Sequence, residues 1–114
     1  MIIGGLFLIA ACTGAIARAF LAGRLNHPGH LAWGTLVVNV TGSFALGLVA
    51  GSSPEVATVI GVGLLGSFTT FSSFARDLVS AIEVHQRLSA AAYLLASLAG
   101  SIGAASIALS LRGV

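Results

Sequence analysis

The chain has 114 residues, of which 57% are hydrophobic and 7% are charged, and its formal net charge is +2. Soluble domains carry about a quarter charged residues, so this composition excludes an ordinary water-soluble domain. The five basic residues are all arginines spread along the chain, a pattern too weak and too dispersed for nucleic-acid binding. We therefore expect an all-α, multi-pass protein of the cell membrane, embedded in the lipid bilayer.

Four apolar stretches are predicted to cross the bilayer, because each approaches the ~20 residues that a helical span needs. The predicted spans are 2–22, 31–50, 56–85 and 88–111. The first contains one charged residue, Arg18, and the single cysteine, Cys12, which we expect to be buried in a helix. Loops with proline and glycine follow the first and second spans. Four spans place both termini on the same side of the membrane.

The third span is expected to be interrupted near 66–72. Its sequence changes there from an apolar run with three glycines to hydroxyls alternating with phenylalanines, G-S-F-T-T-F-S-S-F at 66–74. Glycine weakens a helix, and serine and threonine side chains compete for its backbone hydrogen bonds. Lipid tolerates an interrupted backbone only where it is buried in protein or lines a polar cavity. The stretch is therefore a candidate transport site.

Two other spans carry polar side chains at helical spacing. Thr35, Asn39 and Ser43 fall on one face of the second span. The fourth span carries a similar row, formed by Tyr93, Ser97 and Ser101. A single such serine is explained by a bond to its own i−4 carbonyl. Two such rows beside a helix break favour a transport pathway lined by polar side chains over hydrogen bonds that only stabilise the helices.

The composition of this candidate lining favours an anion. No carboxylate lies in the middle of a span, whereas pathways for cations or protons usually carry one. The lining offers amide, hydroxyl and backbone N–H donors instead. Phe71 and Phe74 are three residues apart, so they share a helix face, and their ring edges carry partial positive charge. Packing or lipid contact is the alternative role for both rings, while Arg18 can reach a vestibule at the membrane surface.

Several motifs resemble those of the CrcB/Fluc family of fluoride channels. The signature stretches are matched by G-T-L-V-V-N-V-T-G-S-F at 34–44 and by G-S-F-T-T-F-S-S-F at 66–74. G-A-I-A-R at 14–18 and the pair of Tyr93 and Ser97 also match. The resemblance extends over all four spans. Ser67 departs from the family pattern, in which this position is often glycine.

The resemblance implies a single four-helix channel domain over residues 1–114, assembled as an antiparallel, dual-topology homodimer with two fluoride pathways. It implies that Gly66 and Thr69 hold a structural sodium ion through their backbone carbonyls, which are oxygen ligands suited to a hard cation. The residues implied in the fluoride pathway are Arg18, Thr35, Asn39, Thr70, Phe71, Ser72, Phe74, Tyr93, Ser97 and Ser101.

The expected function is a fluoride-selective passive channel that exports cytoplasmic fluoride and so reduces its toxicity. A small dual-topology proton-coupled anion exporter is the alternative, although it would need a titratable carboxylate in mid-membrane. A structural subunit would leave the helix break unexplained. An enzyme is not expected, because the three histidines form no metal-ligand set. The arginine distribution, with Arg24 and Arg87 opposite Arg112, leans weakly toward termini outside.

Overall fold

The computed structural model describes residues 2–27, 32–84 and 86–112, and this part of the chain contains helices and no strand. The helices are α1 (Ile2–Leu25), α2 (Trp33–Val49), α3 (Pro54–Val56), η1 (Ala57–Leu65), α4 (Gly66–Phe68), α5 (Phe71–Glu83) and α6 (Arg87–Leu111). The predicted third span corresponds to α3, η1, α4 and α5 together, of which η1 is a π-helix that the sequence did not predict. Two positions within the predicted spans, Leu31 and His85, lie outside the described residues.

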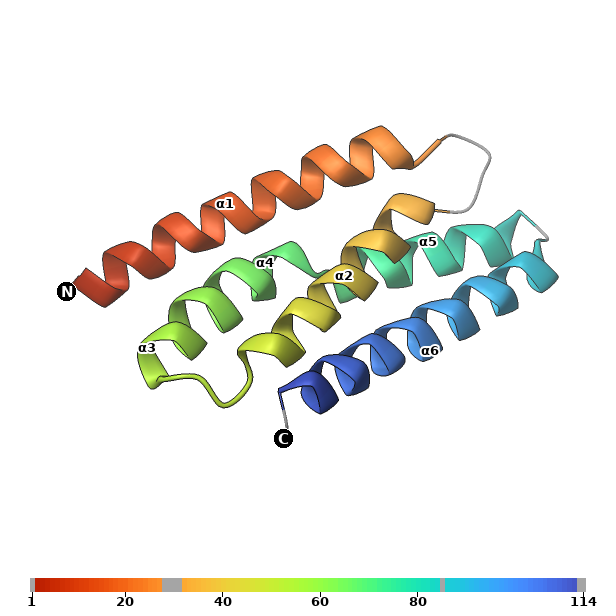
Figure 1. Ribbon diagram of the computed structural model, residues 1–114. Helices are drawn as coiled ribbons and strands as arrows, with labels where there is room; N and C mark the ends of the chain where they lie inside the picture. The colour runs from red at the N-terminus through yellow and green to blue at the C-terminus, as the bar shows by residue number, and fades with distance from the viewer. Residues whose placement is uncertain (1, 28–31, 85, 113–114) are drawn as a thin grey trace.

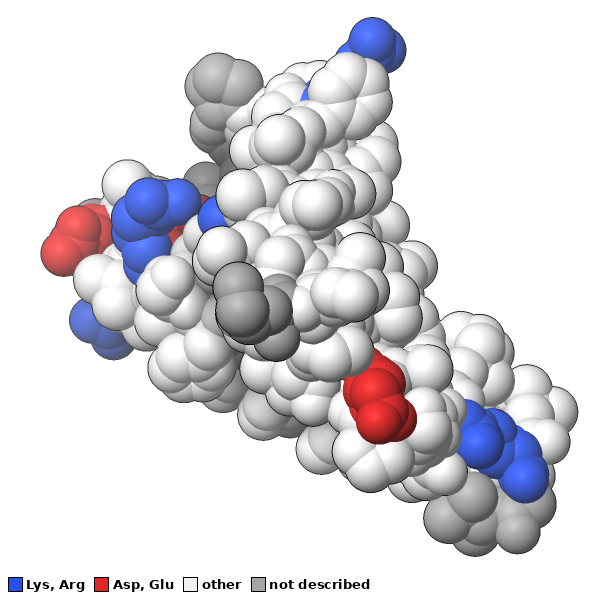
Figure 2. All heavy atoms as spheres, turned by 90° about the vertical axis from the view of Figure 1, so that its left-hand side faces the viewer, with Lys and Arg blue, Asp and Glu red and all other residues white. Residues whose placement is uncertain are grey.

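The lengths of the helices suit a membrane. Three helical stretches are long and apolar enough to cross one, namely Ile2–Leu25, Pro54–Glu83 and Arg87–Leu111. The apolar helix α2 has 17 residues, which is the short end of the ~17–25 residues that a span requires. Charged side chains are few and leave a broad uncharged surface between them (Figure 2). Four helical spans therefore fit the structure.

The helices lie roughly along one another, with α2 in the middle (Figure 1). α2 packs mainly against α6, and α1 packs against η1 and α4. The start of α1 and the end of α6 lie at the same end of the molecule (Figure 1). Glycines permit these close contacts: a Cβ at Gly47 would lie 2.7 Å from the Cβ of Ala108, and one at Gly14 would overlap the Leu64 carbonyl.

Cys12 is exposed on α1, so the expectation that it is buried is wrong for the described chain. α1 meets η1 and α4 through the side that carries Gly14, the one buried residue of this helix. Two residues along an α-helix correspond to about 200° around its axis. Cys12 therefore points away from η1 and α4, against which the Gly14 side of α1 packs.

Side chains that lie outside α2 cap both of its ends. Ala32 at the N-cap of α2 offers no side-chain bond, but Asn26 Oδ1 accepts hydrogen bonds from the backbone N–H groups of Gly34 at 2.7 Å and Thr35 at 3.3 Å. At the opposite end, the Arg112 guanidinium donates to the Leu48 carbonyl. These bonds satisfy backbone groups that a helix leaves unpaired at its termini.

Candidate functional site

The third span breaks at two residues. α4 ends at Phe68, and α5 begins at Phe71. Between them Thr69 (φ −76°, ψ 154°) and Thr70 (φ −148°, ψ 119°) are extended. The Thr70 hydroxyl accepts a hydrogen bond from the Ser73 backbone N–H at 3.1 Å and so caps α5. The interruption therefore lies within the predicted range 66–72, and its second residue, Thr70, is the N-cap of α5.

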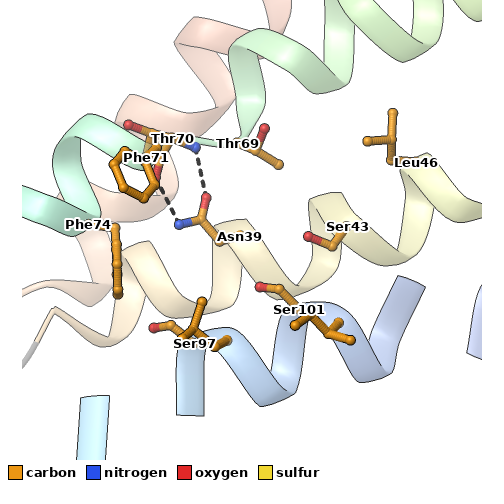
Figure 3. Close-up of a pocket in the computed structure, with 11 residues that line it drawn as sticks. Asn39, Ser43, Leu46, Thr69, Thr70, Phe71, Phe74, Ser97 and Ser101 are labelled. Carbon is orange, nitrogen blue, oxygen red and sulfur yellow. Dashed lines mark hydrogen bonds between the residues drawn. The ribbon is translucent and has the colours of Figure 1, made fainter. Parts of the chain in front are cut away.

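Asn39 of α2 holds the extended backbone in place. The Thr70 N–H donates to Asn39 Oδ1 at 2.7 Å, and Asn39 Nδ2 donates to the Thr70 carbonyl at 2.9 Å. Figure 3 shows both bonds as dashed lines. Because the amide oxygen must accept and the amide nitrogen must donate, this pairing fixes the orientation of the Asn39 side chain. The second N–H of Asn39 remains as a donor beside the break.

A groove of about 290 Å³ runs along this pairing. It is bounded by α2, the break with the start of α5, and α6 (Figure 3). Its lining residues are Asn39, Ser43, Leu46, Thr69, Thr70, Phe71, Phe74, Ser97, Leu98, Ser101 and Ile102. None of them is charged, so the groove presents neutral polar groups and apolar surface.

Two buried hydroxyls of α6 have no partner in the described part of the chain. The Tyr93 and Ser97 hydroxyls are buried, with these residues 1% and 5% exposed, and neither forms a hydrogen bond there. Buried polar groups in proteins are nearly always paired, because an unpaired one costs about 1–3 kcal/mol. Hydroxyls away from the groove, such as those of Thr13 and Ser110, bond their own i−4 carbonyls. Ser97 therefore lines the groove with an unused hydrogen-bonding group.

The two phenylalanines differ in environment although they lie on the same helix. Phe74 is 7% exposed, and its ring packs against Tyr93 with centroids 5.3 Å apart. Phe71 is 78% exposed, and its ring lies 5.9 Å from that of Phe74. Both rings line the groove. The groove therefore runs from a buried aromatic wall to the surface of the single chain.

The break also changes the surroundings of the two carbonyls expected to hold sodium. In a continuous helix the carbonyl of Gly66 would accept from Thr70 N–H, and that of Thr69 from Ser73 N–H. Here the Thr70 N–H donates to Asn39, and the Ser73 N–H donates to the Thr70 hydroxyl. Both carbonyls have thus lost their ordinary helical donors, and the donor chemistry of the site fits a hard cation.

The structure brings together most, but not all, of the predicted pathway residues. Those that line the groove are Asn39, Thr70, Phe71, Phe74, Ser97 and Ser101. Tyr93 is buried behind Phe74, and the exposed Ser72 lies with its hydroxyl 3.4 Å from that of Thr70. Thr35 is buried and does not line the groove; its hydroxyl bonds Asp77 instead. Arg18 lies on α1 and does not line the groove.

Two polar residues near the pathway, Asn26 and Asp77, were given no role by the sequence prediction. The Thr35 hydroxyl donates to Asp77 Oδ2 at 3.1 Å, and Asn26 Nδ2 lies 3.3 Å from the same hydroxyl. The spacing of Asp77 three residues after Phe74 places both on one face of α5 and could have indicated this contact. Ser43 lines the groove and was recognised only as part of a polar row.

Comparisons with known proteins agree with the motifs. A family model described as CrcB-like protein, Camphor Resistance (CrcB), matches residues 5–109. The chain belongs to the CrcB family. A relative from Rhodospirillum centenum, named fluoride-specific ion channel FluC, is 43% identical, and the match covers 79% of this chain and 79% of that protein. A protein of the same name from Agrobacterium fabrum is 41% identical, with coverage of 90% and 92%.

Membership of this family confirms three of the expectations. The resemblance to the CrcB/Fluc family is confirmed. The chain is a multi-pass protein of the cell membrane, in agreement with its apolar helices. It is not an enzyme, because its relatives are ion channels by name.

Proposed function

We propose that the protein is a fluoride-selective passive channel that lets fluoride leave the cytoplasm. The observation that carries the proposal is the groove beside the helix break, lined by neutral groups that include the fixed N–H of Asn39 and the unpaired hydroxyl of Ser97. An amide N–H can only donate, so at Asn39 the groove favours an anion over a cation. The relatives are named fluoride-specific ion channels, so fluoride is the anion that we propose for this protein.

The chemistry of the lining is compatible with fast passage. Fluoride is small and strongly hydrated, so a pore must replace its water with close donors and still release it. A fixed cation at the narrowest point would hold the ion, and none lines the groove in the described chain. The ring edges of Phe71 and Phe74 add weak positive potential. A negative membrane potential then drives export at ~2.3 kcal/mol per 100 mV for each charge.

Flux from liposomes tests this proposal. Vesicles loaded with potassium fluoride should release fluoride when a potassium ionophore is added, without any proton gradient, and matched vesicles loaded with potassium chloride should release chloride far more slowly. The rejection of chloride is expected because neutral donors spaced for a small ion coordinate a larger one poorly. Comparable fluoride and chloride fluxes would refute selectivity.

A proton-coupled anion exporter is the second candidate, and the bond between Thr35 and Asp77 is the observation that favours it. Asp77 is the acidic residue that touches the predicted pathway, although it does not line the groove. In an exporter of this kind, fluoride release would require a proton gradient, and Asp77→Asn would abolish the coupling. Release that follows the electrical gradient alone excludes this candidate.

We further propose that the functional unit is an antiparallel homodimer of dual topology. The 78% exposure of Phe71, a lining residue, supports this assembly, because the open side of the groove needs a second chain to separate it from lipid. The weak arginine bias leaves both orientations accessible. Reporter tags on the C-terminus should then give signal from both sides of the membrane. Signal from one side alone would indicate a partner subunit of opposite orientation.

A structural sodium ion at the dimer centre completes the proposal. The carbonyl oxygens of Gly66 and Thr69 would hold it, and the loss of their helical donors supports this role. When bound, the ion would compensate the partial negative charge of the two carbonyl oxygens that have lost their helical donors. Sodium should therefore raise the melting temperature of the purified protein relative to a large organic cation at the same ionic strength. Equal melting temperatures would exclude the ion.

A further inference from the structure

Ser67 of α4 joins the first half of the broken span, formed by α3, η1 and α4, to helix α1. Its hydroxyl lies 2.8 Å from the Ala11 carbonyl oxygen of α1, which is a hydrogen-bond distance. Gly14 makes room for this contact, because a Cβ there would lie 2.5 Å from the Ser67 hydroxyl oxygen. α1 packs against η1 and α4 over this stretch (Figure 1). Within the described residues, no other hydrogen bond connects α1 to this half of the span.

The same hydroxyl lies where the backbone changes from π-helical to α-helical hydrogen bonding. The N–H of Gly66 donates to the carbonyl five residues earlier, whereas the N–H of Thr69 donates to the carbonyl four residues earlier. Between these two bonds, three carbonyls therefore share two N–H groups. The Ser67 hydroxyl lies 2.6 Å from one of these carbonyls, that of Gly63, and 3.2 Å from the next, that of Leu64. It thus supplies a donor at the turn where the backbone is one short, and lipid would offer none.

Different helices hold the two halves of the broken span. α2 holds the start of the second half, because Asn39 bonds both the N–H and the carbonyl of Thr70. α1 holds the end of the first half through Ser67, the residue directly after Gly66. The peptide unit that joins Gly66 to Ser67 is planar and contains the Gly66 carbonyl. The bond to α1 therefore restrains the direction of this carbonyl.

We propose that Ser67 is a positioning residue for the structural sodium ion, and that it acts by anchoring the Gly66 carbonyl to α1. This inference rests on the sodium site of the proposed function. A bound cation needs its oxygen ligands held at one mutual geometry, and the Gly66 and Thr69 carbonyls belong to two segments that the break makes independent. Residues that orient metal ligands change the affinity for the metal about 10–100-fold when they are replaced.

The test follows the melting temperature of the purified protein as sodium replaces a large organic cation at constant ionic strength. The rise in melting temperature with sodium concentration gives the apparent dissociation constant of the ion. Ser67→Ala should raise this constant at least about tenfold. Ser110→Ala is the matched control, because its hydroxyl also bonds a carbonyl four residues earlier, that of Ser106, but within α6 alone. The control should leave the dissociation constant unchanged.

The melting temperature in the organic cation alone separates positioning from stability. Loss of the hydroxyl should lower this temperature whatever the role of Ser67, so only the sodium dissociation constant reports on positioning. An unchanged constant for Ser67→Ala, with lower melting temperatures in both cations, would overturn the inference and leave the sodium site standing. If Ser67→Ala fails to assemble, Ser67→Gly, which also lacks the hydroxyl, carries the same comparison. Equal melting temperatures of the wild-type protein in both cations would instead refute the sodium site and this inference together.

Discussion

Replacing Asn39 by aspartate changes the charge at the centre of the groove while keeping the size of the side chain. In the native protein the Asn39 amide accepts from the Thr70 N–H at 2.7 Å and donates to the Thr70 carbonyl at 2.9 Å. An aspartate keeps the first bond and loses the second. The aspartate oxygen that replaces the amide nitrogen would face the Thr70 carbonyl oxygen, so the break should be destabilised by about 1–3 kcal/mol.

The larger consequence concerns the ion. A carboxylate about 4 Å from a passing anion repels it by about 4 kcal/mol at an effective dielectric constant of about 20. Since each 1.36 kcal/mol corresponds to a factor of ten in rate, Asn39→Asp should lower fluoride efflux roughly a thousandfold. Asn39→Ala separates this effect from loss of the pairing. It removes both bonds to Thr70 and should destabilise the break by about 2–3 kcal/mol without adding charge.

The measurement combines efflux from liposomes, followed with a fluoride electrode, with the melting temperature of the assembled protein in detergent. Asn39→Asp should be destabilised to an extent similar to Asn39→Ala and should be almost inactive. Asn39→Ala should keep more efflux than the aspartate variant. The reasoning is refuted if the aspartate variant assembles normally and transports fluoride within tenfold of the wild type, because the anion would then pass elsewhere.

Three further outcomes follow from the structure. Phe71→Ile and Phe74→Ile keep bulk but remove the aromatic edge, so fluoride efflux should fall strongly with assembly retained; unchanged efflux would remove the ring-edge role. Gly42→Ala should lower stability by about 1–3 kcal/mol, because a Cβ there overlaps side chains at the start of the break, whereas Gly23→Ala has open space and serves as the control in thermal melting. Asn26→Ala should cost about 1 kcal/mol through loss of the α2 cap, and an unchanged melting temperature would contradict that role.

The sequence alone was sufficient for the features that depend on local chemistry and on the solvent. Apolar stretches of near-span length specify membrane helices whatever they pack against, because lipid leaves backbone groups no other partner. The clustering of glycine and hydroxyl residues located the break, since these residues weaken a helix wherever it lies. The period of 3.6 residues placed Asn39 with Ser43 and Ser97 with Ser101 on shared faces. The resemblance to the family motifs then indicated which anion is transported.

Only the tertiary structure decided which of these faces meet. The pairing of Asn39 with Thr70 joins residues 31 positions apart, and no periodicity within one helix predicts its partner on another. Packing likewise buried Phe74 against Tyr93 and left Phe71 at the surface, although both share a helix face. Arg18 does not line the groove, because its helix α1 packs mainly against η1 and α4 rather than against α5 and α6. Local sequence fixes what each helix can offer, whereas the rotation of each helix about its axis is set by close contacts between small residues on different helices.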